Sequence, residues 1–179
     1  LTWVLRPRYG SEGKFPFKYR NSNKQENSVR ADKMVAPNEI FFEKGPAAKR
    51  FKLLGSEIRE EMNKRINQVM RVTYVRIEEQ RPNKKGKIYD LPAPLSEGRA
   101  KEFVQYDRTA VFTLEALGQG GTEFKVEENT AFALPPDAAK KEYFTKEVTP
   151  DSVTIEYPGA NGARQTVKIM KGALADFSE

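Results

Sequence analysis

Short segments in which apolar and polar residues alternate recur along the chain. A period of two places the apolar side chains on one face of a strand, and glycine, proline or asparagine separates most of the segments. Residues 123–127 alternate clearly, and strand character extends to residues 50–55, 87–91, 109–117, 152–157 and 164–169 and to the short apolar run at 40–42. Short strands at such spacings predict a sandwich or a small barrel rather than a parallel α/β sheet.

The clearest local prediction is a hairpin near the end of the chain. Residues 152–157 and 164–169 both have strand character, and a Pro-Gly-Ala-Asn-Gly segment stands between them. Glycine and asparagine readily adopt the positive φ angles that a tight hairpin turn needs. We therefore expect these two segments to pair antiparallel.

Residues 56–69 are ambiguous between a helix and a strand. The segment is rich in helix formers, begins with a serine that can cap a helix, and spaces its apolar residues at helical intervals. A spacing of four also fits one face of a strand, and residues 69–77 that follow are rich in β-branched residues. A helix over 56–69 followed by a strand is the favoured interpretation, and one long ribbon is the alternative.

Composition suggests three parts of the chain. Residues 1–37 read as a basic, partly extended N-terminal segment that contains a polar loop or linker at 20–33. Residues 38–172 are expected to form the β-sandwich domain, with at most one or two short helices. Residues 173–179 are expected to form a C-terminal tail.

The positive charge is concentrated at the start of the chain. The net charge is +6, and the first fifty residues hold eleven Lys or Arg against five Asp or Glu, which accounts for all of it. The cations singled out as candidate partner-binding residues here are Arg6, Arg8, Lys14, Lys18 and Arg20. Aromatic residues are interleaved with these cations, as in single-stranded nucleic-acid binders. The simpler interpretation is an edge strand or extended arm whose aromatics pack on the core and whose cations face water.

A second basic cluster lies at residues 81–87, where proline, asparagine and glycine indicate a solvated turn. Its candidate partner-binding residues are Lys84, Lys85 and Lys87. Their charge would attract an acidic partner without specifying which one.

The chain contains no histidine and no cysteine. This removes the commonest metal ligands, the usual general base near neutral pH, thiol nucleophiles and disulfides. Carboxylate chemistry, a serine with a lysine, a threonine nucleophile or a lysine Schiff base stay open, but each depends on residues that only the fold can bring together. We expect no enzymatic activity, no cofactor, no metal site and no small-molecule substrate.

Three adjacent carboxylate pairs occur, at Glu60-Glu61, Glu78-Glu79 and Glu127-Glu128. Neighbours on a strand point to opposite faces, so such a pair supplies an acid and a base only where a pocket raises one pKa. The expected role of all six side chains is solvated charge.

The chain begins with the apolar residues Leu1 to Leu5, followed by Arg6 and Arg8. These residues are expected to form an ordinary first strand; the alternative is a segment lying just beyond an upstream membrane anchor or signal peptide.

Residues 109–170 resemble the small β domains of periplasmic scaffold proteins in type IV pilus and type II secretion machines. The resemblance rests on a strand at 124–126, a Phe-Ala-Leu-Pro step at 132–135, the segment 147–155 and a closing strand at 166–169. The whole chain also resembles a pilus-operon protein of gut mucin-degrading bacteria. That resemblance implies an immunoglobulin-like fold related to archaeal type IV pilus subunits.

The resemblance implies a non-catalytic assembly protein of the bacterial cell envelope, periplasmic or on the extracellular surface. Its expected partners are other envelope or pilus subunits, with a membrane involved only through an upstream anchor. The alternative function is a cytoplasmic nucleic-acid-binding module that uses the basic aromatic segment 1–20.

Overall fold

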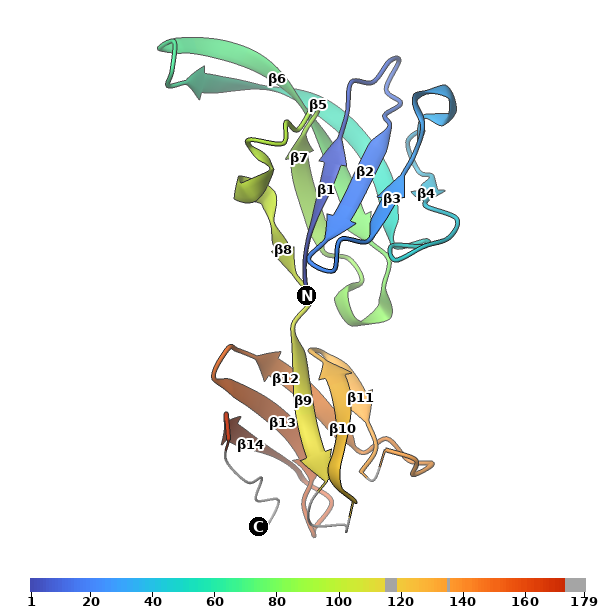
Figure 1. Ribbon diagram of the computed structural model, residues 1–179, viewed down its shortest axis with the longest axis vertical. Coiled ribbons are helices and arrows are strands. Elements are labelled where there is room, and N and C mark those ends of the chain that lie inside the picture. Colours follow the sequence, from blue (N-terminus) through green and yellow to red (C-terminus); the bar gives the residue numbers. More distant parts are fainter. Residues whose placement is uncertain (115–118, 135, 173–179) are drawn as a thin grey trace. The chain divides into compact units, whose positions relative to one another are not determined.

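The computed structural model describes residues 1–114, 119–134 and 136–172, and for Leu114 and residues 119–122 it describes the backbone alone. The chain divides into two compact units, Leu1–Tyr106 and Asp107–Glu179. Both are built from antiparallel strands (Figure 1). The prediction of a mainly β, antiparallel sandwich is confirmed.

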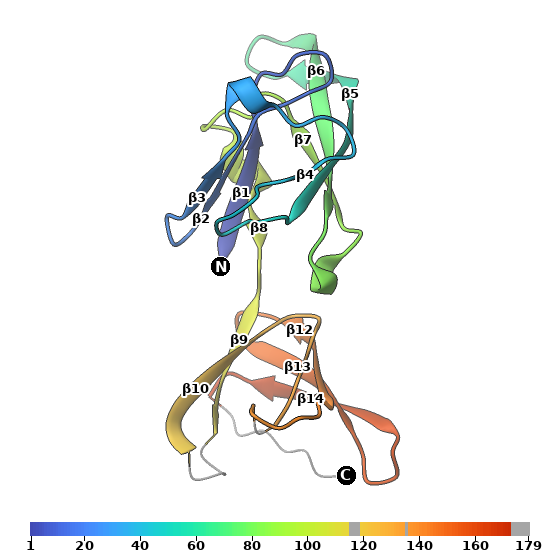
Figure 2. The same ribbon diagram turned by 90° about the vertical axis from the view of Figure 1, so that its right-hand side faces the viewer.

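Unit 1 contains two four-stranded sheets that form the two layers seen in Figure 2. The order in the first sheet is β3-β2-β1-β8, and the order in the second is β4-β5-β6-β7. The strands are β1 (Thr2–Pro7), β2 (Phe17–Asn21), β3 (Glu26–Ser28), β4 (Ile40–Phe41), β5 (Phe51–Asn63), β6 (Gln68–Glu79), β7 (Ile88–Pro92) and β8 (Gln105–Tyr106). Three 3-10 turns, η1 (Ala31–Lys33), η2 (Pro82–Lys84) and η3 (Ala100–Phe103), are the only helical elements among the described residues.

The core of unit 1 is aromatic and lies between the two sheets. Trp3 from the first sheet contacts Phe51 and Tyr89 from the second, at ring-centroid distances of 5.2 and 5.3 Å. Phe17 stacks on Phe41 at 4.4 Å. All five rings are buried. Because β1 and β2 alternate strictly, they place these rings inward and their charged residues outward.

Unit 2 is a smaller sandwich-like arrangement. It pairs β9 (Thr109–Leu114) with β10 (Gln119–Glu127), and orders β11 (Thr130–Phe132), β12 (Tyr143–Val148), β13 (Ser152–Pro158) and β14 (Arg164–Met170) in a second sheet. Its separate core includes Val126, Phe132 and Ile155. The predicted hairpin is confirmed: β13 and β14 pair antiparallel in continuous register from Ser152↔Met170 to Pro158↔Arg164.

The domain boundaries expected from the sequence differ from this division. Residues 1–37 contribute β1, β2 and β3 to the first sheet of unit 1, and the polar stretch 20–33 contains β3. Residues 38–172 do not form one sandwich, because the change of unit falls between Tyr106 and Asp107. Strand pairing and buried aromatics order the N-terminal segment despite its charge. The tail at 173–179 lies outside the described residues.

The expected helix at 56–69 is wrong, and the alternative of one long ribbon describes the structure. β5 runs through Gly55 to Asn63, turns over four residues and returns as β6 from Gln68. The register shifts at a β-bulge between Leu53 and Gly55. Strand pairing along the whole segment overrides its helix propensity.

Candidate functional site

The outer half of the β5–β6 hairpin extends beyond the strands that flank it. On one side β4 pairs only with Phe51 and Lys52, and backbone hydrogen bonds with residues 38 and 39 end at Leu53. On the other side the β6–β7 ladder ends at Tyr74, with one further bond from Ala93 to Thr73. Within the described residues both edges are unpaired from there to the turn (Figure 1).

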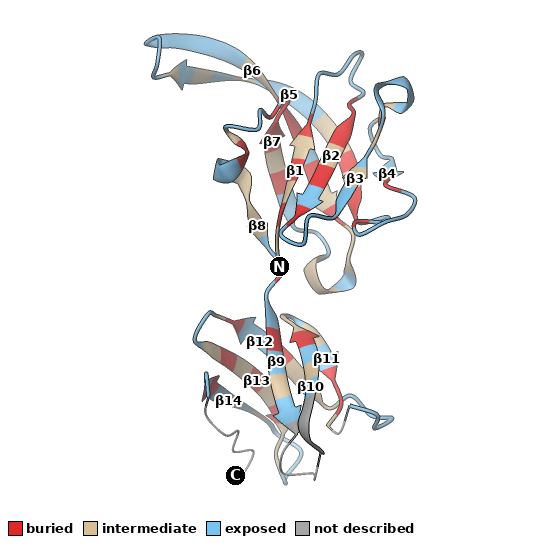
Figure 3. Ribbon diagram, in the orientation of Figure 1, coloured by how far each residue is buried: buried red, intermediate tan, exposed pale blue. Residues whose placement is uncertain are grey.

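Three exposed apolar residues of this hairpin continue the face that is buried inside unit 1, with Glu60 and Arg71 opposite each other between them. Val75 is buried in the core and pairs with Ser56. Since a strand repeats every two residues, Ile58 and Met62 share that face, and Val69 lies opposite Met62. Ile58, Met62 and Val69 are 60%, 56% and 59% exposed. Figure 3 shows the change from buried to exposed colours along these strands. An apolar face that leaves its core uncovered indicates an interaction surface.

An ion cluster on the opposite face stiffens the base of the hairpin. Asp90 of β7 accepts hydrogen bonds from Arg76 Nε at 2.9 Å and from Arg59 Nη2 at 2.8 Å. Arg59 also donates to Glu57 at 2.7 Å, and its guanidinium lies 4.6 Å from the centroid of the Tyr74 ring. The cluster joins three strands where the hairpin leaves the sandwich.

This cluster makes unit 1 sensitive to acid. Hydrogen bonds from Arg76 lower the pKa of Asp90 from 3.8 to about 2; burial opposes the change, and hydrogen bonds from Arg59 add to it. Because the folded-state pKa is below the unfolded one, the stabilisation is complete well above pH 4 and is lost as the pH falls towards 2. Because Asp90 is partly exposed, solvent screening reduces the stabilisation that the shifted pKa implies. We expect Asp90→Asn to lower the free energy of unfolding at pH 7 by about 1 kcal/mol. Urea titrations at several pH values check this; a difference that persists undiminished at pH 2 would contradict it.

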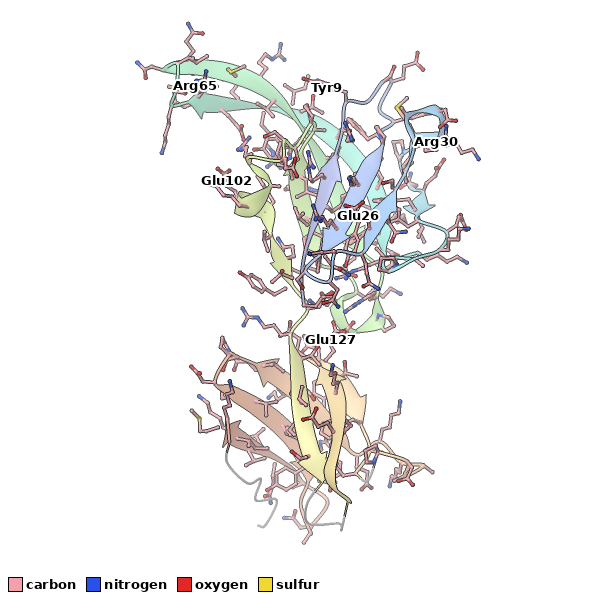
Figure 4. All side chains as sticks on the ribbon, viewed as in Figure 1. Tyr9, Glu26, Arg30, Arg65, Glu102 and Glu127 are labelled. Carbon is pink, nitrogen blue, oxygen red and sulfur yellow. The ribbon has the colours of Figure 1, made fainter. Side chains whose placement is uncertain are left out.

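A hollow of about 1620 Å³ lies beside the hairpin. Its lining comes from the β1–β2 loop, the hairpin and the segment after β7, including Tyr9, Met62 and Arg99. Figure 4 shows Tyr9 and Glu102 near this part of unit 1 and Arg65 at the end of the hairpin. Arg99 ties the hairpin to η3, with its Nη1 3.3 Å from Glu61 and its Nε 3.0 Å from Glu102. These two carboxylates are held in ion pairs with Arg99.

One residue of the expected solvated carboxylate pairs is not solvated. Glu79 is fully buried and accepts hydrogen bonds from Arg50 Nε at 2.8 Å, from Arg50 Nη2 at 3.1 Å and from the Tyr89 hydroxyl at 2.9 Å. The Arg50 guanidinium lies 4.4 Å from the centroid of the Trp3 ring. The expectation was wrong because the ion pair and the hydrogen bonds stabilise this charge inside the core.

The five N-terminal cations predicted as binding residues lie on the outer side of the first sheet or in its β1–β2 loop. Arg6 lies opposite Lys18 in the antiparallel register of β1 and β2, and Arg20 lies two residues further along β2. Lys18 and Arg20 lie 3.6 and 3.7 Å from Glu26, which partly neutralises them. Arg6 donates to the Leu95 carbonyl. Arg8 and Lys14 are exposed, on the loop side of this group.

The remaining three predicted cations lie in the segment that connects β6 and β7 of the second sheet. The Lys84 ammonium group donates to the Tyr106 carbonyl at 2.7 Å. Lys87 lies 5.2 Å from the centroid of the Tyr89 ring. Lys85 is exposed. The segment forms a turn, as predicted, and η2 lies within it.

Four of the five aromatics interleaved with the N-terminal cations are not available for stacking on bases. Trp3, Phe15, Phe17 and Tyr19 are all buried, while Tyr9 is exposed. The interpretation that these rings pack on the core is confirmed, but the expected edge strand or extended arm is wrong, because β2 pairs with both β1 and β3. A nucleic acid would have to bind this segment through its cations and Tyr9 alone. Nucleic-acid binding itself stays a prediction.

The sequence did not indicate the projecting hairpin as an interaction site. Its apolar residues Ile58, Met62, Ile66 and Val69 have a helical spacing and read as a buried face. The usable signal was a four-residue spacing that also fits one face of a strand, together with the strand character of residues 69–77. That these side chains lie beyond the core follows only from where β4 and β7 end.

Among the described residues, no group of three or more acidic side chains is placed to hold a metal ion, and no helix has the length and apolar character needed to cross a membrane. No family model matches the chain, and neither the curated proteins nor the solved structures contain a match to it.

Proposed function

We propose that this chain is a non-catalytic assembly protein of the bacterial cell envelope or surface, which binds another envelope or pilus subunit through the unpaired edge of β5. The observation that carries the proposal is the outer edge of β5 from Leu54 to Asn63, which pairs with no strand that the structure describes and lies next to an exposed apolar face. An unpaired strand edge offers backbone hydrogen-bonding groups to an incoming strand, and neighbouring side chains give specificity.

The base of the hairpin supports this role. Arg59, Arg76 and Asp90 hold β5, β6 and β7 together on one face, and Arg99 contacts Glu61 further out. A strand edge that is already fixed loses less conformational entropy when a partner strand adds to it. The pilus assignment and the envelope location rest on the resemblance of the sequence.

Site-specific photo-crosslinking in the native host tests the proposal. With a photoreactive residue at position 58, we expect adducts to a second envelope or pilus subunit in envelope or surface fractions. The matched control is position 20, since Arg20 is exposed but lies on β2 between two paired strands. The proposal fails if the protein is recovered only from the cytoplasm, or if positions 58 and 20 give the same adducts.

A charge on the edge should block the same contact. Ile58→Lys replaces an exposed apolar side chain with a lysine, the residue that natural edge strands use against strand addition. With the photoreactive residue moved to position 56, we expect Ile58→Lys to lower the adduct yield about tenfold, which corresponds to about 1.4 kcal/mol of binding free energy. Val111→Lys, at a position in unit 2 that is 53% exposed, should leave the yield unchanged. A yield that is also unchanged in Ile58→Lys would exclude this edge.

A further inference from the structure

The turn that ends the β5–β6 hairpin combines exposed apolar and cationic side chains. We call residues 62–71 the hairpin tip. Its apolar members are Met62, Ile66, Val69 and Met70, all between 43% and 59% exposed. The tip also contains three cations and no acidic residue.

The cations of the tip form no ion pair with any other residue that the structure describes. Lys64, Arg65 and Arg71 are all exposed. The ion pairs formed by the described residues of unit 1 involve none of these three; the nearest acidic residue in sequence, Glu61, pairs with Arg99 instead. Figure 4 shows the Arg65 side chain directed outward from the end of the hairpin. Both the charge and the apolar surface of the tip are therefore available to a partner.

This combination matches the interface of an anionic bilayer. Apolar side chains enter the boundary between headgroups and acyl chains, while lysine and arginine extend their charged ends to the anionic headgroups. A protein partner for four apolar residues would have to desolvate the neighbouring cations or supply acidic residues at matching positions. The hairpin carries its tip beyond the strands that flank it in unit 1, so these strands do not cover the apolar and cationic side chains of the tip.

We infer that the hairpin tip binds the surface of anionic lipid membranes. The tip inserts Met62, Ile66 and Val69 at the headgroup boundary, and Lys64, Arg65 and Arg71 contact lipid phosphates. This function goes beyond the proposed strand addition, which uses the edge of β5 and is tested by protein adducts at position 58 rather than by binding to vesicles. Loss of either activity alone separates the two.

Co-sedimentation of the 179-residue chain with vesicles tests the inference. We expect binding to vesicles of phosphatidylglycerol and phosphatidylcholine that weakens as salt is added, and little binding to phosphatidylcholine alone. Lys64→Gln with Arg65→Gln should lower the partition coefficient about thirtyfold, since each cation near an anionic surface contributes about fivefold. Ile66→Ser should lower it about tenfold through lost apolar burial.

The matched control is Lys85→Gln with Lys87→Gln, which removes the same charge from another exposed turn of unit 1. We expect this control to bind vesicles as the unchanged protein does. Equal loss in both double variants would mean general charge attraction and would overturn the inference. Absence of vesicle binding at low salt would also overturn the inference, even if the tip crosslinks to a protein instead.

Insertion depth gives a second readout. Ile66→Trp places a fluorophore at the tip, while the natural Trp3 is buried in the core. Vesicles containing brominated lipid should quench the added fluorescence at position 66 and leave Lys85→Trp unquenched. Quenching at position 85 but not at 66 would place the membrane contact in the turn between β6 and β7 and would overturn the inference.

Discussion

Replacing Glu79 by glutamine should destabilise unit 1 by about 3–5 kcal/mol, which is the usual effect of removing one partner of a buried ion pair. Glu79→Gln keeps the size of the side chain but leaves the Arg50 guanidinium buried without its bidentate carboxylate. The contact of Arg50 with the Trp3 ring compensates only in part. Urea unfolding followed by the fluorescence of Trp3, the single tryptophan, measures the change directly.

Two further variants separate the burial of this pair from its charge. Asp32→Asn removes the carboxylate of an exposed pair with Arg30 in the same unit, and should change the free energy of unfolding by less than about 0.5 kcal/mol. Replacing both Arg50 and Glu79 by leucine should cost less than Glu79→Gln, because no unpaired charge is left inside. A Glu79→Gln effect no larger than that of Asp32→Asn would contradict the role given to the buried pair.

Truncating Ile155 should destabilise unit 2 by about 2–5 kcal/mol, through lost burial and the cavity left behind. Ile155 is 1% exposed, lies on β13 between β12 and β14, and belongs to the core of that unit. Trp3 lies in unit 1, so hydrogen exchange of peptides from β12 to β14 is the suitable measurement. Ile155→Ala should accelerate their exchange by at least a factor of thirty, or about 2 kcal/mol.

The control for Ile155→Ala is Val111→Ala, at an exposed position on β9. It should change the same exchange rates by less than about threefold, since an exposed side chain loses little burial. If both substitutions accelerate exchange equally, Ile155 is not the centre of this core.

Local pattern sufficed for much of the fold. The β13–β14 hairpin was predictable because its turn residues and its strand alternation agree. The mainly β architecture could be predicted because glycine, proline or asparagine separates most of the short apolar segments. The N-terminal segment was harder to predict, because outward-facing cations on β1 and β2 hide the inward alternation of Trp3, Leu5 and Phe17.

Two features needed the tertiary structure. Residues 56–69 satisfy helix propensity and strand pairing equally well, and only the partner strand β6 decides between them. The sequence around Glu79 does not distinguish it from a solvated carboxylate. Its burial depends on hydrogen bonds from Arg50, which immediately precedes β5, and from Tyr89 on β7. Five of the eight candidate binding cations are exposed, whereas Arg6, Lys18 and Lys84 are half-buried. The projecting hairpin follows from the lengths of neighbouring strands.

The bulge between Leu53 and Gly55 decides which chemistry each side of the projecting hairpin presents. Before the bulge the odd-numbered residues of β5 face the core, as Phe51 and Leu53 do; after it the even-numbered residues occupy that side. In an uninterrupted ladder Ile58 would share a face with Asp90, and Arg59 would point away from its carboxylate partner. One extra residue therefore places Ile58, Met62 and Val69 on one side of the hairpin and the ion cluster of Arg59 and Asp90 on the other.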